Sequence, residues 1–342
     1  MSFGPVSEEF ASFLLLGGSA VAGYLAMRGM VDALVCADDP APAKRAVIHS
    51  MMTAIISLAA ILHRPALADI AVGVPFSATV AAVTLALGVI LFVAPRTDPT
   101  VEPIYHRAWA FLLPTGLLTL LIGFSGEFSP RSALMLAAEG GAILVVCIGP
   151  RARPELPLVW GVGDPERGEE RAKPRGGFAV AQAFFAIVLA VVAGLGMVQG
   201  AAGLALHNPA FRPGVSAVLA LGPAIVLPMI PPLATSAERG RRDEATSAIV
   251  YFALINLCVV LPLVVVAGQL IPAAVATTEP SAKADLPFPI LVWRLDTVLL
   301  TTIGLLLLPT AIGRWALSRA EGLGLIGVYV IYLFLTLLVS HG

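Results

Sequence analysis

Residues 49–91 read HSMMTAIISLAAIL (49–62), HRPALADIAVG (63–73) and VPFSATVAAVTLALGVIL (74–91), which predicts two apolar helices joined by a short polar corner. Further along the chain, residues 227–266 repeat this plan in LPMIPPLATSAERGRRDEATSAIVYFALINLCVVLPLVVV. In each copy a helix of small residues leads into a tight polar loop and then into a longer helix that contains small and hydroxyl residues. The repetition predicts that the chain contains two related halves.

The composition of the chain is that of a protein surrounded by lipid. Hydrophobic residues make up 58% of the sequence and charged residues 13%, whereas soluble domains contain about 25% charged residues. The net charge of −1 and the lack of a basic stripe argue against a nucleic-acid partner. Three widely spaced cysteines form no pattern typical of a disulfide or a metal site. We therefore expect a membrane protein with no metal, no cofactor and no catalytic residues, and not an enzyme.

Apolar runs of about 20 residues are long enough to cross a bilayer as helices. The predicted fold is an all-α integral membrane protein with ten transmembrane helices, at about 10–35, 46–62, 69–94, 108–124, 132–149, 178–206, 214–236, 245–271, 288–310 and 320–339. A polar linker at 150–177 separates a first repeat (1–149) from a second (178–342). Because each repeat has an odd number of spans, the second enters the membrane inverted, as in many secondary transporters.

The distribution of basic residues predicts the orientation of the chain. Fifteen Lys and Arg residues lie on the side of the linker and four on the other side. Because cytoplasmic loops carry the excess of basic residues, we expect a multi-pass protein of the plasma membrane with a cytoplasmic linker and both termini outside. The linker itself is interpreted as a solvated connection, with a regulatory loop as the alternative.

The sequence resembles the calcium/cation antiporter superfamily, of the sodium/calcium exchanger type. The resemblance is carried by Ile55–Ala60 and Asp69–Gly73 in the first repeat, and by Leu233–Ser236 and Arg239–Arg241 in the second. The segments Glu321-Gly322 and Tyr329–Tyr332 resemble the last helix of the family. The family pairs a helix bearing G-T-S-x-P-E with a helix opening G-N-x-x-G-S-N, and it does so in each of two inverted repeats. The resemblance therefore implies an exchanger fold.

The chain departs from the family at the residues that bind the ion. The two family glutamates, which hold Ca²⁺ or Na⁺ at the membrane centre, correspond to Thr53 and Pro232. The second motif becomes Gly73–Thr79 in one repeat and Ser247–Ala253 in the other. Calcium requires six to eight oxygen ligands, several of them from carboxylates. Loss of both carboxylates predicts that the chain does not exchange Ca²⁺.

The remaining polar residues of the two repeats define a candidate ion or substrate pathway. Hydroxyl residues recur at helical spacing on the second span, which is typical either of helix packing or of a cation or water site. The prolines of the seventh span indicate either a broken helix lining a cavity or a plain kink. The candidate pathway residues are Ser50, Thr53, Ser57, Ser77, Thr79, Pro232, Ser247 and Asn256.

Ionisable residues inside a membrane are costly, and they are functional candidates by default. Glu139 in the fifth span, and Arg294 with Asp296 in the ninth, are such residues; for Arg294 the alternative is structural anchoring. Two functions fit these observations. One is a diverged secondary transporter coupled to a monovalent cation or a proton, with the bilayer and a small cation as its partners. The other is a transport-inactive pseudo-exchanger that serves as a scaffold or subunit of a membrane complex.

Overall fold

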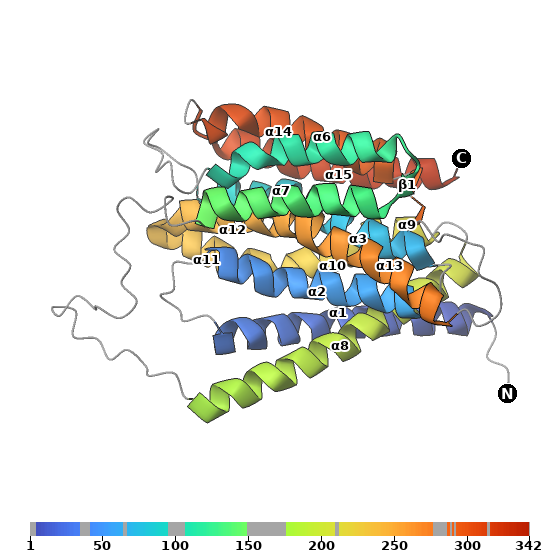
Figure 1. Ribbon diagram of the computed structural model, residues 1–342. Helices are drawn as coiled ribbons and strands as arrows, with labels where there is room; N and C mark the ends of the chain where they lie inside the picture. Colours follow the sequence, from blue (N-terminus) through green and yellow to red (C-terminus); the bar gives the residue numbers. More distant parts are fainter. Residues whose placement is uncertain are drawn as a thin grey trace.

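Helices make up nearly all of the computed structural model, and most of their axes run alongside one another (Figure 1). The structure describes residues 5–34, 42–63, 67–94, 107–148, 176–208, 212–275, 286–287, 289–290, 292–312 and 315–341. The predicted linker at 150–177 lies outside these ranges except for its last two residues. Within them the helical character predicted from the apolar runs is confirmed apart from two short strands, and the arrangement as ten spans in inverted repeats stays a prediction.

The first part of the chain contains one long helix, Ala68–Val93, that is divided into α3, η2 and α4 because η2 is a single π-helical turn within it. The bounds of the elements in this part are α1 (Pro5–Leu34), α2 (Pro42–His63), α3 (Ala68–Ala81), η2 (Ala82–Ala86), α4 (Leu87–Val93), η3 (Arg107–Phe111), α6 (Leu112–Gly123), β1 (Glu127–Phe128) and α7 (Pro130–Ile148).

The second part begins with a long helix, and a series of shorter helical segments follows it. Their bounds are α8 (Gly176–His207), α9 (Pro213–Ser216), η6 (Ala217–Leu221), α10 (Gly222–Val226), η7 (Leu227–Met229), α11 (Ile230–Ser236), η8 (Ala237–Arg241), α12 (Arg242–Ile255), η9 (Asn256–Val260), α13 (Leu261–Val275), β2 (Leu286–Pro287), η10 (Val292–Thr297), α14 (Val298–Ala311) and α15 (Arg319–His341). Strands β1 and β2 pair antiparallel and link the two parts of the chain.

Seven helical segments of the described chain are long and apolar enough to cross a membrane. They are Glu8–Leu34, Ala43–Leu62, Ala68–Val93, Ala179–His207, Pro213–Leu270, Trp293–Ala311 and Arg319–Val339, and a shorter apolar helix runs over Ala108–Gly123. The segment Pro213–Leu270 has 58 residues, about twice what a bilayer requires. Gly240 interrupts it, since its φ of 84° is not helical. The chain is a membrane protein.

Small residues place α3 at the centre of the bundle. Every residue from Ile70 to Ala81 is buried, including the internal Pro75. At its crossing with α10, a Cβ atom on Gly222 would lie 2.8 Å from the hydroxyl oxygen of Ser77, so only glycine fits there. By contrast α8 exposes large apolar side chains such as Val180 and Phe185, as expected of a helix that faces lipid.

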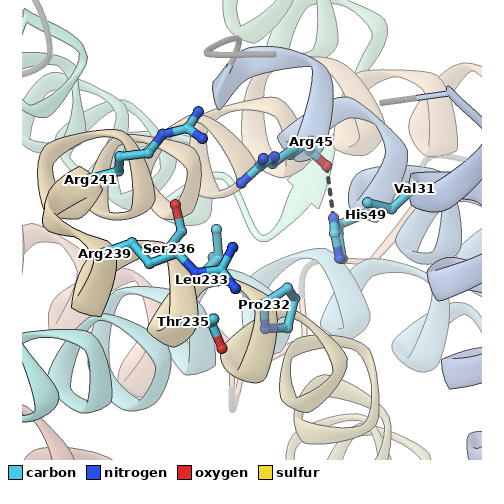
Figure 2. Close-up of a pocket in the computed structure, with 9 residues that line it drawn as sticks. All are labelled: Val31, Arg45, His49, Pro232, Leu233, Thr235, Ser236, Arg239 and Arg241. Carbon is cyan, nitrogen blue, oxygen red and sulfur yellow. Dashed lines mark hydrogen bonds between the residues drawn. The ribbon is translucent and has the colours of Figure 1, made fainter. Parts of the chain in front are cut away.

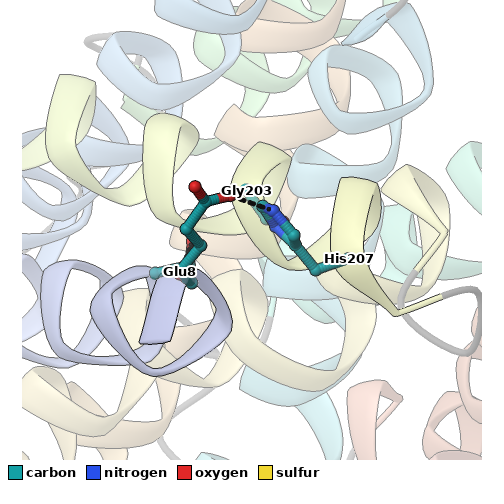
Figure 3. Close-up of polar contacts among 4 residues, drawn as sticks. Glu8, Gly203 and His207 are labelled. Atoms are coloured by element: carbon teal, nitrogen blue, oxygen red, sulfur yellow. Dashed lines mark hydrogen bonds and ion pairs between the residues drawn. The ribbon is translucent and has the colours of Figure 1, made fainter. Parts of the chain in front are cut away.

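Helices α1 and α8 pack along most of their length (Figure 1). The contact is close because glycines of α8 meet α1 directly: a Cβ atom on Gly200 would lie 2.8 Å from the backbone nitrogen of Leu16. This small-residue packing is how membrane helices gain contact in the absence of a hydrophobic driving force. At one end the ring of His207 lies 2.8 Å from the Glu8 carboxylate and also bonds the carbonyl of Gly203 (Figure 3).

Packing between the two parts of the chain follows a reciprocal pattern. Helix α2 packs on α12, and α3 packs on α10. Likewise α4 packs on α15, and α13 packs on α7. The α2–α12 contact, between the predicted second and eighth spans, thus has its counterpart in the α3–α10 contact, between the third and seventh. In the same way the α4–α15 contact, between the third and tenth spans, has its counterpart in the α13–α7 contact, between the eighth and fifth. Gly322 of α15 meets Gly88 of α4, while Gly140 of α7 meets Cys258 of η9.

Candidate functional site

Three hydroxyl residues of α2 form a buried polar stripe without hydrogen bonds. Ser50, Thr53 and Ser57 are separated by three and four positions, so they share one face of the helix. All three are buried, and Thr53 and Ser57 have no exposed surface. Within the described part of the chain, none of their hydroxyl oxygens has a hydrogen-bond partner. Buried polar groups are normally bonded, so these exceptions mark the stripe as a candidate ligand site.

Asn256 brings further unpaired polar atoms to the same region. It opens the π-helical turn η9, which packs on both α2 and α3. Its side chain is fully buried, and neither Oδ1 nor Nδ2 has a partner among the described residues. Single π-helical turns inside α-helices are frequent at functional sites. The stripe and Asn256 thus contribute four buried side-chain oxygens without partners, on two elements that pack against each other.

The other predicted hydroxyl residues lie in the same core and make bonds. Ser77 donates a hydrogen bond to the carbonyl of Ala217, with 3.0 Å between the oxygens. Thr79 donates to the carbonyl of Pro75 at 2.7 Å and approaches that of Ala253 at 3.4 Å. These groups tie α3 to η6 and α12, which is the packing role left open by the sequence. Ser247 is fully buried in α12.

Pro232 lies elsewhere, on the wall of a pocket with a volume of about 280 Å³ (Figure 2). The pocket lies between α1, α2 and the α11–η8 segment, and its lining includes His49, Arg45, Ser236 and Arg239. Thr53 is not part of its lining. Among the prolines of the predicted seventh span, Pro228 lies in the 3₁₀ turn η7 and Pro232 lines this pocket.

The ligand atoms at the candidate site are neutral oxygens of hydroxyl and amide groups. No group of three or more His, Cys, Asp or Glu side chains in the described ranges could hold a metal ion. Of the two positions that the sequence comparison predicted to replace the family glutamates, Thr53 is buried and Pro232 lines the pocket. Hydroxyl and amide oxygens can coordinate a monovalent cation or order water, but several carboxylates are usual for Ca²⁺.

The intramembrane acids make specific contacts that the sequence did not predict. Thr115 of α6 donates a hydrogen bond to Oε1 of Glu139 at 2.8 Å, and Oε2 of Glu139 has no partner in the described chain. Tyr332 of α15 donates to Oδ1 of Asp296 at 2.7 Å, and Oδ2 of the fully buried Asp296 is likewise unpaired.

Arg294 and Asp296, the two charged candidates of the predicted ninth span, lie in different environments. Arg294 is exposed, whereas Asp296 is buried and bonds Tyr332. Residues two positions apart point in different directions on a helix, which explains the separation. Arg294 therefore fits the anchoring interpretation.

Residues 178–338 match the family described as sodium/calcium exchanger protein. No curated protein matches the chain in sequence.

Solved structures match over nearly the whole chain. The H⁺/Ca²⁺ exchanger CAX has a TM-score of 0.68 at 13% identity, with 99% of this chain and 87% of that chain covered. Native YfkE has a TM-score of 0.64 at 15% identity, with 94% and 88% covered. The sodium-calcium exchanger NCX_Mj soaked with 10 mM Na⁺ and 10 mM Sr²⁺ has a TM-score of 0.53 at 16% identity, with 96% and 97% covered. At these identities the likeness establishes the fold alone.

Proposed function

We propose that the chain is a member of the calcium/cation antiporter superfamily and that it functions as a secondary transporter, moving a monovalent cation or a proton across the membrane. The exchanger-like fold makes cation antiport the general expectation. The finer assignment, a diverged transporter without the paired ion-binding glutamates, follows from the side chains at the candidate site.

The single observation that carries the proposal is the set of unpaired oxygens between α2 and η9. The hydroxyls of Ser50, Thr53 and Ser57 and the amide of Asn256 are buried without partners in the described structure. A buried hydroxyl or amide without a hydrogen bond costs about 1–3 kcal/mol in proteins. A bound monovalent cation would recover part of that cost by coordinating the oxygens.

The proposed cation is monovalent because the four unpaired oxygens belong to neutral hydroxyl and amide groups and none to a carboxylate. A fully dehydrated divalent ion would bring two charges into a site of neutral ligands, and burying unpaired charge is far more costly than neutral oxygens can offset. A monovalent ion brings half that charge into the site. We therefore exclude Ca²⁺ from the proposed cargo.

The proposed architecture is ten spans in two inverted five-helix repeats, at 1–149 and 178–342, connected by a cytoplasmic linker at 150–177. The reciprocal packing of α2 with α12 and of α3 with α10 supports it, because a two-fold axis in the membrane plane exchanges these pairs. The basic-residue asymmetry supports a plasma-membrane protein with both termini outside.

The alternative function is that of a pseudo-exchanger, which keeps the fold as a scaffold or subunit of a membrane complex. It is favoured by the loss of both family glutamates, at Thr53 and Pro232, and by the separation of Pro232 from Thr53 in the lining of the pocket. In this case the unpaired oxygens would bind water instead of a transported ion.

The test compares thermal unfolding of the purified protein in NaCl, KCl and LiCl with choline chloride at constant ionic strength. A cation present at 100 times its dissociation constant stabilises the folded state by about 2.7 kcal/mol. We expect such a shift for a monovalent cation, its loss in Thr53→Val and its retention in Thr336→Val. Thr336 is a suitable control because it is equally buried but already bonds the carbonyl of Tyr332 at 2.9 Å.

Flux measurements in liposomes separate the two functions. A pH gradient or a Na⁺ gradient should drive movement of the stabilising cation through the wild-type protein and not through Thr53→Val. Stabilisation without flux would favour the pseudo-exchanger. A Ca²⁺-dependent stabilisation of the same size, lost in Thr53→Val, would contradict the proposed valence.

A further inference from the structure

The pocket lined by Pro232 is strongly basic, which is unexpected at a cation pathway. Arg45 of α2 and Arg239 and Arg241 of η8 all line it. Arg241 is engaged by Glu244, whose Oε2 lies 2.9 Å from Nε and 2.8 Å from an Nη atom. The other two arginines, Arg45 and Arg239, have no carboxylate partner among the described residues.

The two arginines approach the pocket from opposite walls. Figure 2 shows the guanidinium groups of Arg45 and Arg239 both extending into the space between α2 and the α11–η8 segment. The Nε atom of Arg45 is buried and has no hydrogen-bond partner in the described part of the chain. A buried guanidinium N–H without an acceptor is costly. A ligand that offers an acceptor to this N–H would remove the cost.

Ser236 provides an independent sign of a missing ligand. Its side chain lines the pocket, is only 9% exposed, and has a hydroxyl without a partner among the described residues. The hydroxyl and the Arg45 guanidinium are both hydrogen-bond donors. Donors that converge from two walls of one cavity require an acceptor-rich ligand of negative charge.

We propose that this pocket is a binding site for a phosphate-type oxyanion, held by Arg45 and Arg239 with the Ser236 hydroxyl as an additional donor. Guanidinium groups match tetrahedral oxyanions because two parallel N–H groups bond two oxygens. A cavity of about 280 Å³ holds one phosphate group with room for water. The site does not depend on transport by the central oxygens, since Thr53 is not in its lining.

The position of the pocket leaves two sources for the phosphate. It lies where α2 begins and where Gly240 separates α11 from α12, at one end of the helices. Basic pockets between membrane helices at such ends bind lipid headgroups, and free phosphate carries the same chemistry. An empty pocket of this charge would repel entering cations, so the anion would also decide whether cations approach from this side.

The experiment uses the full-length protein in nanodiscs of neutral phosphatidylcholine, with thermal unfolding and binding of radiolabelled inorganic phosphate as readouts. The second arm replaces part of the lipid with phosphatidylglycerol and omits phosphate. We expect stabilisation in at least one arm: a response to phosphate in neutral lipid identifies the free anion, and a response to phosphatidylglycerol alone identifies the headgroup.

Substitution tests the assignment to these side chains. Arg239→Gln and Ser236→Ala should weaken the effective affinity, the former by about tenfold, because it removes a charge-assisted contact. Arg239 is exposed, so its replacement leaves the core intact. Arg319→Gln, which removes an exposed arginine at the start of α15, should bind as the wild type does.

Two results would overturn the proposal. One is the absence of a response to both phosphate and phosphatidylglycerol in the folded wild-type protein. The other is an equal loss of response in Arg239→Gln and Arg319→Gln, which would assign the effect to overall surface charge. Arg45→Gln, whose charge lies deeper in the pocket, should reproduce the Arg239→Gln result if it folds.

Discussion

The hydrogen bond between Tyr332 and Asp296 permits a matched test of the buried polar contacts. Tyr332 donates to Oδ1 at 2.7 Å, while the neighbouring Tyr329 is buried with a hydroxyl that has no partner in the described chain. The two rings have centroids 6.1 Å apart and lie in the same helix. Tyr332→Phe and Tyr329→Phe therefore remove the same atom from nearly the same surroundings.

The two substitutions should differ in their effect on the free energy of unfolding. Tyr332→Phe leaves Asp296, which is fully buried, without a hydrogen bond among the described residues. Hydrogen bonds to charged groups are worth about 1.5–3 kcal/mol, and a stranded buried acid adds to that loss. Tyr329→Phe removes a hydroxyl that is already unsatisfied, so it should be neutral or slightly stabilising.

Thermal unfolding of the variants in one detergent and at one scan rate measures this difference. The conditions must match because membrane proteins often unfold irreversibly, and the apparent melting temperature then depends on the scan rate. Asp296→Asn and its combination with Tyr332→Phe complete a double-mutant cycle. We expect a coupling energy of about 1 kcal/mol or more between Asp296 and Tyr332. Equal destabilisation by both tyrosine substitutions, with no coupling to Asp296, would refute the assignment of that hydrogen bond.

Three further predictions concern the backbone and the topology. Gly322→Ala should destabilise the protein by about 1–3 kcal/mol, because its Cβ atom would lie 2.8 Å from a carbonyl oxygen of α4. Gly324→Ala is the control: its Cβ atom would meet open space, and the same melting assay should show no loss of stability. Gly240→Ala should cost about 1–2 kcal/mol in unfolding free energy, because φ there is 84°. Cysteines replacing Arg131 and Arg319 should react with an impermeant thiol reagent from opposite sides of intact cells, and labelling of both from one side would contradict the proposed orientation.

The sequence was sufficient for the properties that depend on composition and local spacing. Low charge and long apolar runs predicted a helical membrane protein, and the family resemblance predicted the exchanger fold found in the solved structures. The hydroxyl stripe of α2 was visible because Ser50, Thr53 and Ser57 recur at helical spacing. The assignment of the candidate pathway to these residues stays a prediction.

Contacts between distant segments could not be predicted in the same way. Ser77 and Thr53 are both buried hydroxyl residues, but only Ser77 meets a carbonyl of a neighbouring helix to which it can donate. Nothing local to Arg45 shows that it lines a pocket with Arg239, nearly two hundred residues away. Arg294 and Asp296 are two positions apart, yet the helix turns Arg294 to the surface and Asp296 into the core, where it bonds Tyr332.

The packing of α1 against α8 has a consequence for the synthesis of the protein. Gly200 meets Leu16, a residue made 184 positions earlier. At about 5–20 residues per second, the ribosome takes roughly 10–40 s to deliver this partner. During that interval the face of α1 that packs on α8 lacks its partner, and the contacts of α2, α3 and α4 with the second half are equally incomplete. The first half is thus an insertion intermediate whose assembly waits for the second.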